Sequence, residues 1–200
     1  MIKIENAVTT GWQAAIRGMR NPMNSWLKID SFDDKLGEND RELMKKLERS
    51  GSDHAKYRRM IVVTMDIVAP LYWWKEFDTY KVGTVSNSCS TMHKIAEKEF
   101  TLEDFSHEHM SIASETCLET TIGYLNLFRQ SFLENHDKDN WWQMIQLLPS
   151  SYNQRRTILL NYEVLANIYK SRKDHKLDEW REFCKWIEGL PNSFLISCEE

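Results

Sequence analysis

The chain has 200 residues, of which 42% are apolar and 12% aromatic, while only 7 are Gly and 4 are Pro. This content allows a real hydrophobic core and argues against a β-sandwich cut by many turns and against a disordered protein. The 26 Lys and Arg residues against 30 Asp and Glu give a formal charge of −4. We therefore expect no general attraction to nucleic acid or to membranes, and an anionic ligand must find a local basic site.

The apolar stretches are too short to span a membrane, and residues 1–10 lack the layout of a signal peptide. A cytoplasmic protein is expected. The cysteines are scattered and form no CxxC pair, which favours reduced thiols over a disulfide framework and predicts no metal site; they are Cys89, Cys117, Cys184 and Cys198.

The first half of the chain alternates short strands and helices. Alternation predicts a strand over residues 1–9, and helices are expected over 11–19 and 40–50, the second stopped by Gly51. Residues 59–69 (RMIVVTMDIVA) read as a strand covered on both faces and ended by Pro70. Aromatic residues at helical spacing predict a short buried helix over 71–80.

The second half is richer in helix. Apolar spacing predicts a long helix over 106–135, then a helix over 139–147, a buried strand over 156–160 and a helix over 162–172. Asp174 is expected to cap a last helix whose inner stripe is Leu177, Trp180, Cys184 and Ile187. These elements predict an α/β (α+β) subunit, helix-rich with a small central sheet, that forms one domain over residues 1–200.

A polar stretch, KVGTVSNSCSTMHK at residues 81–94, follows the aromatic-rich stretch APLYWWKEFDTY at residues 69–80. It lacks the glycine spacing of a P-loop or a dinucleotide fingerprint. Its hydroxyl and amide groups, with backbone N–H groups in an irregular turn, would suit a phosphate or a ring carbonyl. A plain surface loop is the alternative.

Residues 155–181 hold seven cations against four acids, a local charge of +3. The segment could bind a phosphate through its arginines, or it could be a charged outer face. Arg172 and Arg181 are nine residues apart and would lie on opposite sides of one continuous helix, so they converge only if the helix breaks near Lys173-Asp174. His107-Glu108-His109 is a possible metal-binding group, but it has no evident third ligand nearby. The Trp73-Trp74 and Trp141-Trp142 pairs could stack on a base or a flavin, although aromatic residues at helical spacing are more typical of a core.

Several stretches in this order resemble the flavin-dependent thymidylate synthases (ThyX), which methylate dUMP with FAD and methylenetetrahydrofolate. The stretch from Gly51 to His54, followed by a strand and APLYWWKEFDTY, is similar to that family's Gly-His turn, strand and anchored helix. In the signature loop, Tyr80-Lys81-Val82 aligns with the family's Arg-His-Arg. Asn87 and Ser90 align with its Asn and Ser, while Met92 takes the place of its second Arg.

The C-terminal half resembles the family more closely. Leu148-Pro149 and the residues up to Arg155 resemble its Leu-Pro-x-x-x-Tyr-x-Arg segment. Asn161 and Arg172 match the Asn that opens and the Arg that closes the next helix. After a one-residue deletion Glu179-Trp180-Arg181 resembles the family's Glu-Ile-Arg, although the usual Ala-Gln before it is absent.

The resemblance implies a homotetramer with sites between subunits that binds a pyrimidine nucleotide such as dUMP. It implies Arg181 as the catalytic residue and Arg155, Arg172 and Ser90 as substrate-binding residues. For FAD it implies Lys81, Asn87, Ser88, His54 and Asn161, with folate and NADPH as co-substrates if the protein is active. Val82 and Met92 stand where the family has charge, so the alternative is a nucleotide-binding or structural protein that has lost the chemistry.

Overall fold

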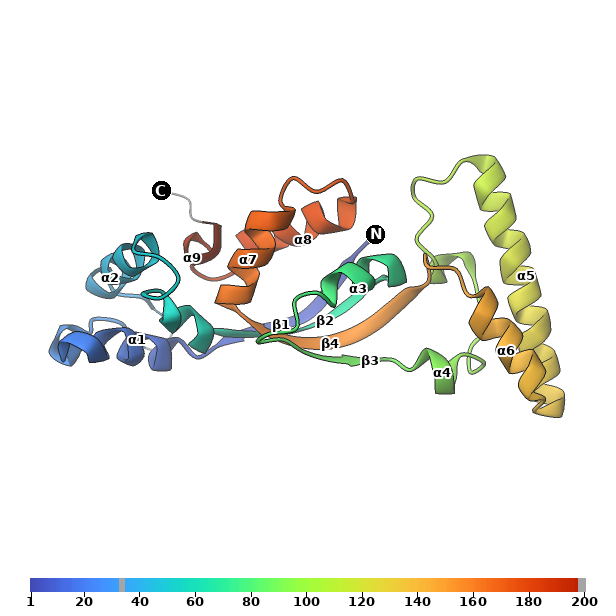
Figure 1. Ribbon diagram of the computed structural model, residues 1–200, viewed down its shortest axis with the longest axis horizontal. Helices are drawn as coiled ribbons and strands as arrows, with labels where there is room; N and C mark the ends of the chain where they lie inside the picture. The colour runs from blue at the N-terminus through green and yellow to red at the C-terminus, as the bar shows by residue number, and fades with distance from the viewer. Residues whose placement is uncertain (33–34, 198–200) are drawn as a thin grey trace. The chain divides into compact units, whose positions relative to one another are not determined.

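A computed structural model of the chain describes residues 1–32 and 35–197 (Figure 1). Its first half contains β1 (Lys3–Thr10), α1 (Trp12–Arg20), the 3-10 helices η1 (Asn21–Met23) and η2 (Trp26–Lys28), α2 (Glu38–Arg49), η3 (Lys56–Met60), β2 (Val62–Pro70), α3 (Leu71–Phe77), β3 (Val85–Ser88) and α4 (Thr91–Lys94). The second half contains η4 (Leu102–Asp104), α5 (Ile112–Asn135), α6 (Lys138–Leu147), β4 (Asn153–Asn161), α7 (Tyr162–Arg172), α8 (Asp178–Glu188) and α9 (Phe194–Ser197). Among these residues no helix combines the length and apolarity that crossing a bilayer requires.

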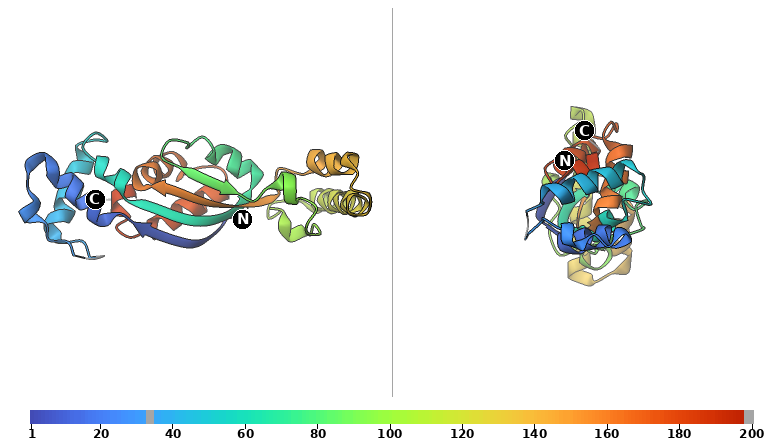
Figure 2. Two further views of the ribbon diagram at one scale, coloured as in Figure 1. Left: turned by 90° about the horizontal axis from the view of Figure 1, so that it is seen from below. Right: turned by 90° about the vertical axis from the view of Figure 1, so that its left-hand side faces the viewer.

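The four strands form one small sheet in the order β1-β2-β4-β3, with β1 and β3 at its two edges (Figure 2). The central pair is antiparallel, because Leu71 N–H donates to the Tyr152 carbonyl at one end and Tyr162 N–H donates to the Ile61 carbonyl at the other, both at 3.0 Å. The predicted fold class, helix-rich α/β with a small sheet, is confirmed.

Two compact units divide the chain, and the division runs through the strands. Unit 1 comprises residues 1–3, 67–79 and 87–156, and unit 2 comprises residues 4–66, 80–86 and 157–200. The expectation of one domain over residues 1–200 stays a prediction.

Unit 1 has its core beneath the α5–α6 hairpin, where Phe100, Phe105, Leu125 and Met144 are buried. The aromatic helix α3 is also buried, with Trp73 and Trp74 fully enclosed as predicted. The two rings meet edge to face with centroids 4.8 Å apart, and the Trp74 indole N–H donates to the Gln154 carbonyl at 2.9 Å. The tryptophan pair therefore belongs to the core.

Unit 2 is built around α7 and α8, whose inner faces bury Leu165, Ile168 and Trp180. The short helix α9 is held against them by Arg58, which pairs with Glu163 at 2.8 Å and donates to the Leu195 carbonyl at 3.1 Å. Because Arg58 is buried and its charge is paired, it contributes to the packing of this unit.

Several sequence expectations need correction. In β2 only alternate residues such as Met65 are fully buried, since Asp66 on the other face accepts hydrogen bonds from Asn6 and Thr157. The long helix begins at Ile112 instead of residue 106, because Ser106 makes hydrogen bonds outside the helix, from its N–H to the Ser151 carbonyl and from its hydroxyl to the Asn153 side chain. Asp174 does not cap the last long helix, which has Leu177 at its N-cap and is followed by α9.

The polar stretch at residues 81–94 contains an edge strand, β3, that its composition did not predict. All four residues of β3 are exposed, so the strand has no alternating apolar pattern. Next to it, the Cys89 N–H donates to the Arg155 carbonyl at 2.9 Å. This strand is therefore defined by its backbone pairing with β4 and not by burial of its side chains.

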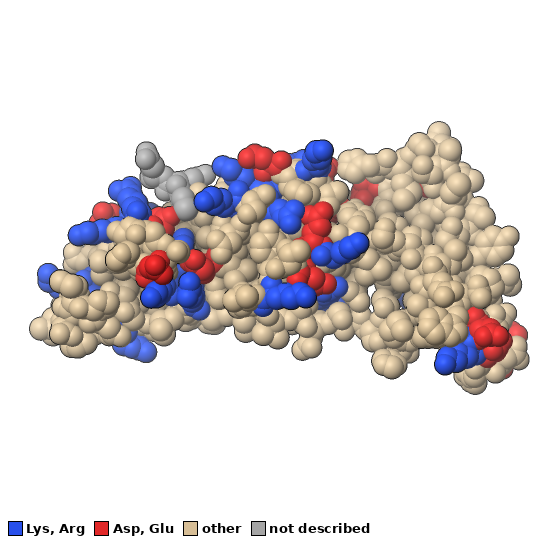
Figure 3. All heavy atoms as spheres, viewed as in Figure 1, with Lys and Arg blue, Asp and Glu red and all other residues tan. Residues whose placement is uncertain are grey.

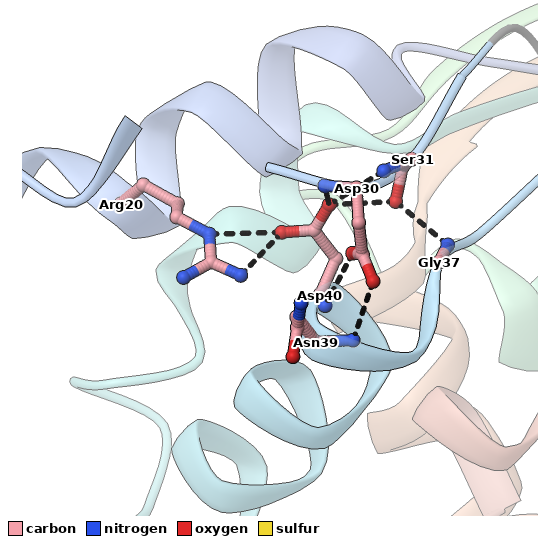
Figure 4. A network of polar contacts seen from close by, with 6 residues as sticks. All are labelled: Arg20, Asp30, Ser31, Gly37, Asn39 and Asp40. Carbon is pink, nitrogen blue, oxygen red and sulfur yellow. Dashed lines mark hydrogen bonds and ion pairs between the residues drawn. The ribbon is translucent and has the colours of Figure 1, made fainter. Parts of the chain in front are cut away.

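A buried ion pair joins α1 to α2 in unit 2 (Figure 4). The Arg20 guanidinium bonds one oxygen of Asp40 at 2.7 and 2.8 Å, and the other oxygen accepts from the Ser31 hydroxyl and from the N–H groups of Asp30 and Ser31. Burial alone would raise the pKa of the Asp40 carboxyl, but the hydrogen bonds from Ser31, Arg20 and the backbone hold that pKa below its usual value. The carboxylate therefore stabilises the folded state in its charged form.

Replacing Asp40 by Asn should lower the free energy of unfolding at neutral pH by about 3–5 kcal/mol, because the Arg20 charge would remain buried without its partner. The native contribution is present above the unfolded-state pKa of about 3.9 and is lost as the pH falls through the lower folded-state pKa. Urea unfolding at several pH values should show the two proteins converging in acid. The surface pair on the same helix supplies the control: Glu42→Gln should change little, and an equal loss in both variants would contradict the assignment.

Candidate functional site

A cleft of about 180 Å³ in unit 1 brings two predicted substrate residues, Arg155 and Ser90, together. One wall is the segment around the start of α4, and the other is the start of β4. The residues that line it are Cys89, Ser90, Thr91, Lys94, Ile95, Tyr152, Asn153, Gln154 and Arg155. The two walls are more than fifty residues apart in the sequence, so only the folded chain makes this cleft.

A relay of polar contacts holds the two walls in place. Arg156 pairs with Asp78 at 2.8 Å and donates to the Gln154 side-chain oxygen at 3.0 Å. The buried Gln154 amide then donates to the Cys89 carbonyl at 2.9 Å, and the Arg156 guanidinium lies over the Trp74 ring, 4.3 Å from its centroid. Arg156 is therefore a structural residue, while its neighbour Arg155 has its side chain exposed at the cleft.

The lining of the cleft suits an anion. Arg155 and Lys94 supply two positive charges, and Lys94 also pairs with the exposed Glu97 at 2.9 Å. The Ser90 oxygen accepts the His93 N–H at 3.1 Å, which leaves its hydroxyl hydrogen able to donate to a ligand. A volume of about 180 Å³ is smaller than a typical site for a whole small molecule, so it matches a phosphate group with part of a sugar.

Arg172 and Arg181 belong to unit 2 and flank the break that the sequence predicted between them. Helix α7 ends at Arg172 and α8 begins at Asp178. The Arg172 guanidinium donates to the Tyr80 hydroxyl at 3.0 Å and lies over the Trp180 ring, 4.8 Å from its centroid. Its planar cation is held between aromatic side chains.

The Arg181 guanidinium closes the turn that precedes its own helix. It donates to the carbonyls of His175 at 2.8 Å and Lys176 at 3.1 Å and forms an ion pair with Asp178. These contacts give hydrogen-bond donors to backbone carbonyl groups in the turn between α7 and α8. Over α7 and α8 the surface carries both signs of charge side by side (Figure 3), as a charged outer face would.

The five residues predicted to hold the flavin are distributed as follows. Asn87 and Ser88 are exposed on β3 in unit 1, and Lys81 is exposed in unit 2. Asn161 caps α7 by accepting the Val164 N–H at 3.0 Å. The Asn161 amide also lies close to Gly83, where an added Cβ atom would be only 2.9 Å from the amide nitrogen. His54 lies in unit 2 and lines a separate, larger cavity.

Sequence reasoning missed Lys94, Tyr152 and Gln154 as members of the cleft. Lys94 closes the polar stretch and could have been considered as a local cation, but Gln154 has no distinguishing signal in the sequence. Burial raises the pKa of the Tyr152 phenol, which keeps it neutral and able to donate a hydrogen bond.

The described cysteines differ in environment. Cys89 is exposed at the cleft and Cys117 is exposed on α5, whereas Cys184 is buried in α8. Burial raises the pKa of the Cys184 thiol to about 12. All three are free thiols, as expected, and Cys198 lies outside the described residues.

No protein-family model and no curated protein sequence matches the chain. Solved structures do match it in fold. A flavin-dependent thymidylate synthase ThyX from Helicobacter pylori, complexed with FAD and dUMP, is 15% identical with a TM-score of 0.71, and the match covers 98% of each chain. A second structure of Helicobacter pylori ThyX with FAD and dUMP is also 15% identical, with a TM-score of 0.76 over 98% of this chain and 97% of that one. The chain therefore has the fold of the flavin-dependent thymidylate synthases, as its sequence resemblance predicted.

Proposed function

We propose that this protein binds a pyrimidine nucleotide such as dUMP, with the phosphate group in the cleft beside Arg155. The observation that carries the proposal is the meeting of Arg155, Lys94 and Ser90 at one cleft. It is supported by the fold, since the similar structures from Helicobacter pylori contain dUMP. A cleft with two cations in a protein of net charge −4 is a local basic site of the kind that an anionic ligand requires.

The residues of the cleft have distinct roles in this proposal. The Arg155 guanidinium donates two parallel hydrogen bonds to phosphate oxygens, which fixes the orientation of the group. Lys94 adds a point charge, and the hydroxyl groups of Ser90 and Thr91 donate to the remaining oxygens. The sugar and the base extend beyond the cleft, because its volume does not hold a whole nucleotide.

The roles of Arg172 as a substrate-binding residue and of Arg181 as the catalytic residue remain predictions. Both guanidinium groups already have partners, Tyr80 and Trp180 for Arg172 and Asp178 for Arg181. Binding through Arg181 requires that the ligand replace the Asp178 carboxylate.

The residues at the expected flavin site do not fit FAD. The pyrophosphate of FAD carries two negative charges, whereas Val82, 91% exposed, and Met92, 46% exposed, stand where the resemblance expects arginines. The Asn161 side-chain oxygen already accepts the Val164 N–H as a helix cap. Each missing charge-assisted contact costs on the order of 2–4 kcal/mol of transition-state stabilisation, so we propose nucleotide binding without efficient methyl transfer.

We further propose a homotetramer, as the resemblance implies. Exposed apolar side chains on α5 support it, including Tyr124 at 54% and Leu127 at 57% exposure. In the view of Figure 3 the surface over most of α5 carries no lysine or arginine. A partner chain that covers this face would remove apolar surface from water.

The first test is isothermal titration of the protein with dUMP. Arg155→Ala should weaken binding roughly 10- to 150-fold, because one charged hydrogen-bonding group contributes about 1.5–3 kcal/mol. Lys138→Ala, which removes an exposed cation on α6 outside the cleft, should leave the affinity unchanged. Equal affinities of the native protein and Arg155→Ala would contradict the proposed phosphate site.

Alkylation of cysteines locates the nucleotide independently. Saturating dUMP should slow the reaction of Cys89 with iodoacetamide at least tenfold, because the ligand covers the cleft, while Cys117 on α5 should react at an unchanged rate. Cys184 should stay unlabelled at pH 8 in both samples, since it is buried and its pKa is about 12. Peptide mass spectrometry measures each site. Binding of dUMP without protection of Cys89 would show that the nucleotide binds outside this cleft.

The proposed lack of flavin chemistry has a spectroscopic test. Freshly purified protein should be colourless, and added FAD should keep the fluorescence of free flavin, because the pyrophosphate lacks its positive partners. No thymidylate should form from dUMP with methylenetetrahydrofolate, NADPH and FAD. A yellow protein with one FAD per chain would refute this part, whereas the dUMP titration tests nucleotide binding separately.

A further inference from the structure

Unit 2 contains a cavity of about 710 Å³ that the proposed nucleotide site does not use. It lies among α1, η1, η2, α2 and the turn that leads into η3. Its volume falls in the range of sites that enclose a complete small molecule. Every residue that lines it belongs to unit 2, whereas every residue of the Arg155 cleft belongs to unit 1.

The walls of the cavity are mainly apolar. Met19 and Tyr57 are buried behind it, and Leu43 and Leu47 present one side of α2 to it. The Tyr57 hydroxyl already donates to the Met44 carbonyl at 3.0 Å, so the ring contributes mainly apolar surface. These walls would bury the hydrocarbon part of a ligand.

Arg20 also lines the cavity, but its charge is neutralised. Figure 4 shows its guanidinium directed at Asp40, which is itself held by Ser31 and by the backbone. With the ion pair formed inside the protein, the wall at Arg20 offers no net charge to a ligand. Any charge that selects the ligand must come from the other polar residues of the lining.

Those residues give the cavity a positive balance. Lys28, Lys56 and His54 lie on its lining with one acid, Asp53, and all four are exposed. The two lysines against one aspartate leave a charge of +1. An apolar cavity with cationic groups at its solvent side is complementary to a molecule with an apolar body and one acidic group.

We propose that this cavity is a second ligand site, which binds a small amphipathic anion: a body of one to three rings that carries one carboxylate or sulfonate. The rings occupy the space beside Leu43, Leu47 and Tyr57, and the acidic group lies toward Lys28 and Lys56. The proposal does not depend on the proposed nucleotide binding, because no residue is shared between the two sites.

A pair of fluorescent probes tests the apolar walls and the charge separately. 8-Anilinonaphthalene-1-sulfonate should bind saturably at one molecule per chain, and N-phenyl-1-naphthylamine, which lacks the sulfonate, should bind the same cavity more weakly. Leu47→Trp fills the cavity and should lower the affinity for both probes at least tenfold. Saturating dUMP should displace neither probe.

The role of the positive charge is tested by a variant that changes only exposed residues. Lys28→Ala combined with Lys56→Ala should weaken binding of the sulfonate probe about tenfold and leave the uncharged probe unaffected. Lys170→Ala combined with Lys173→Ala removes two exposed cations elsewhere in unit 2 and should affect neither probe. If Leu47→Trp fails to fold, as circular dichroism would reveal, Leu43→Phe replaces it and the charge variants still decide.

Several outcomes would overturn the proposal. They are the absence of saturable binding, unchanged affinity in a folded cavity-filling variant, and equal effects of the two lysine double variants on the sulfonate probe. Displacement of the probe by dUMP would also overturn it, because the cavity would then be the nucleotide site.

Discussion

The antiparallel pairing of β2 with β4 is the constraint on which the candidate site depends. Backbone hydrogen bonds join the two strands where β2 passes into α3 and where β4 passes into α7. Because each backbone group in a central strand must be paired, this register fixes which β4 side chains lie beside β3 and which pack on the aromatic helix. It puts Gln154 against Cys89 and Arg155 at the cleft. A shift by one residue would exchange the buried Gln154 with the exposed Arg155.

Four arginines of this protein illustrate two physical situations. Arg20, Arg58 and Arg156 have their charge paired with a carboxylate, and Arg20 and Arg58 are buried. Such residues join elements, since removing either partner leaves a charge without its counterion. Arg155 has its side chain exposed at a cleft that also contains Lys94. This difference in burial and position, and not the presence of arginine, distinguishes a candidate ligand contact from a structural cation.

The likeness of fold to ThyX and the identity of individual residues carry different information. A TM-score of 0.71–0.76 over nearly the whole chain at 15% identity means that the folds are similar although most side chains differ. The cleft at Arg155 has the charges that a phosphate needs. Val82 and Met92, which stand where the sequence resemblance expects cations, are exposed. In our proposal nucleotide binding and flavin chemistry therefore separate on this fold, because they depend on different side chains.

The sequence by itself determined most of the elements, because periodic burial leaves a periodic pattern. The helix α7 was predicted with its observed bounds, and the aromatic helix at Trp73 and Trp74 was predicted as core. The sequence also indicated the helix break between Arg172 and Arg181. The edge strand β3 could not be predicted, since its four residues are exposed and only backbone bonds define it.

Tertiary structure alone decided which residues form a site. Arg155 and Ser90 were recognised one by one, but their meeting with Lys94 and Gln154 depends on the pairing of segments that are far apart in the chain. The same holds for the unit 2 cavity, where His54 lies with Leu43, Leu47 and Lys28. No sequence pattern indicates that these three residues line a cavity. Local sequence specifies local backbone preference and burial, whereas a cavity arises from long-range packing that no short stretch encodes.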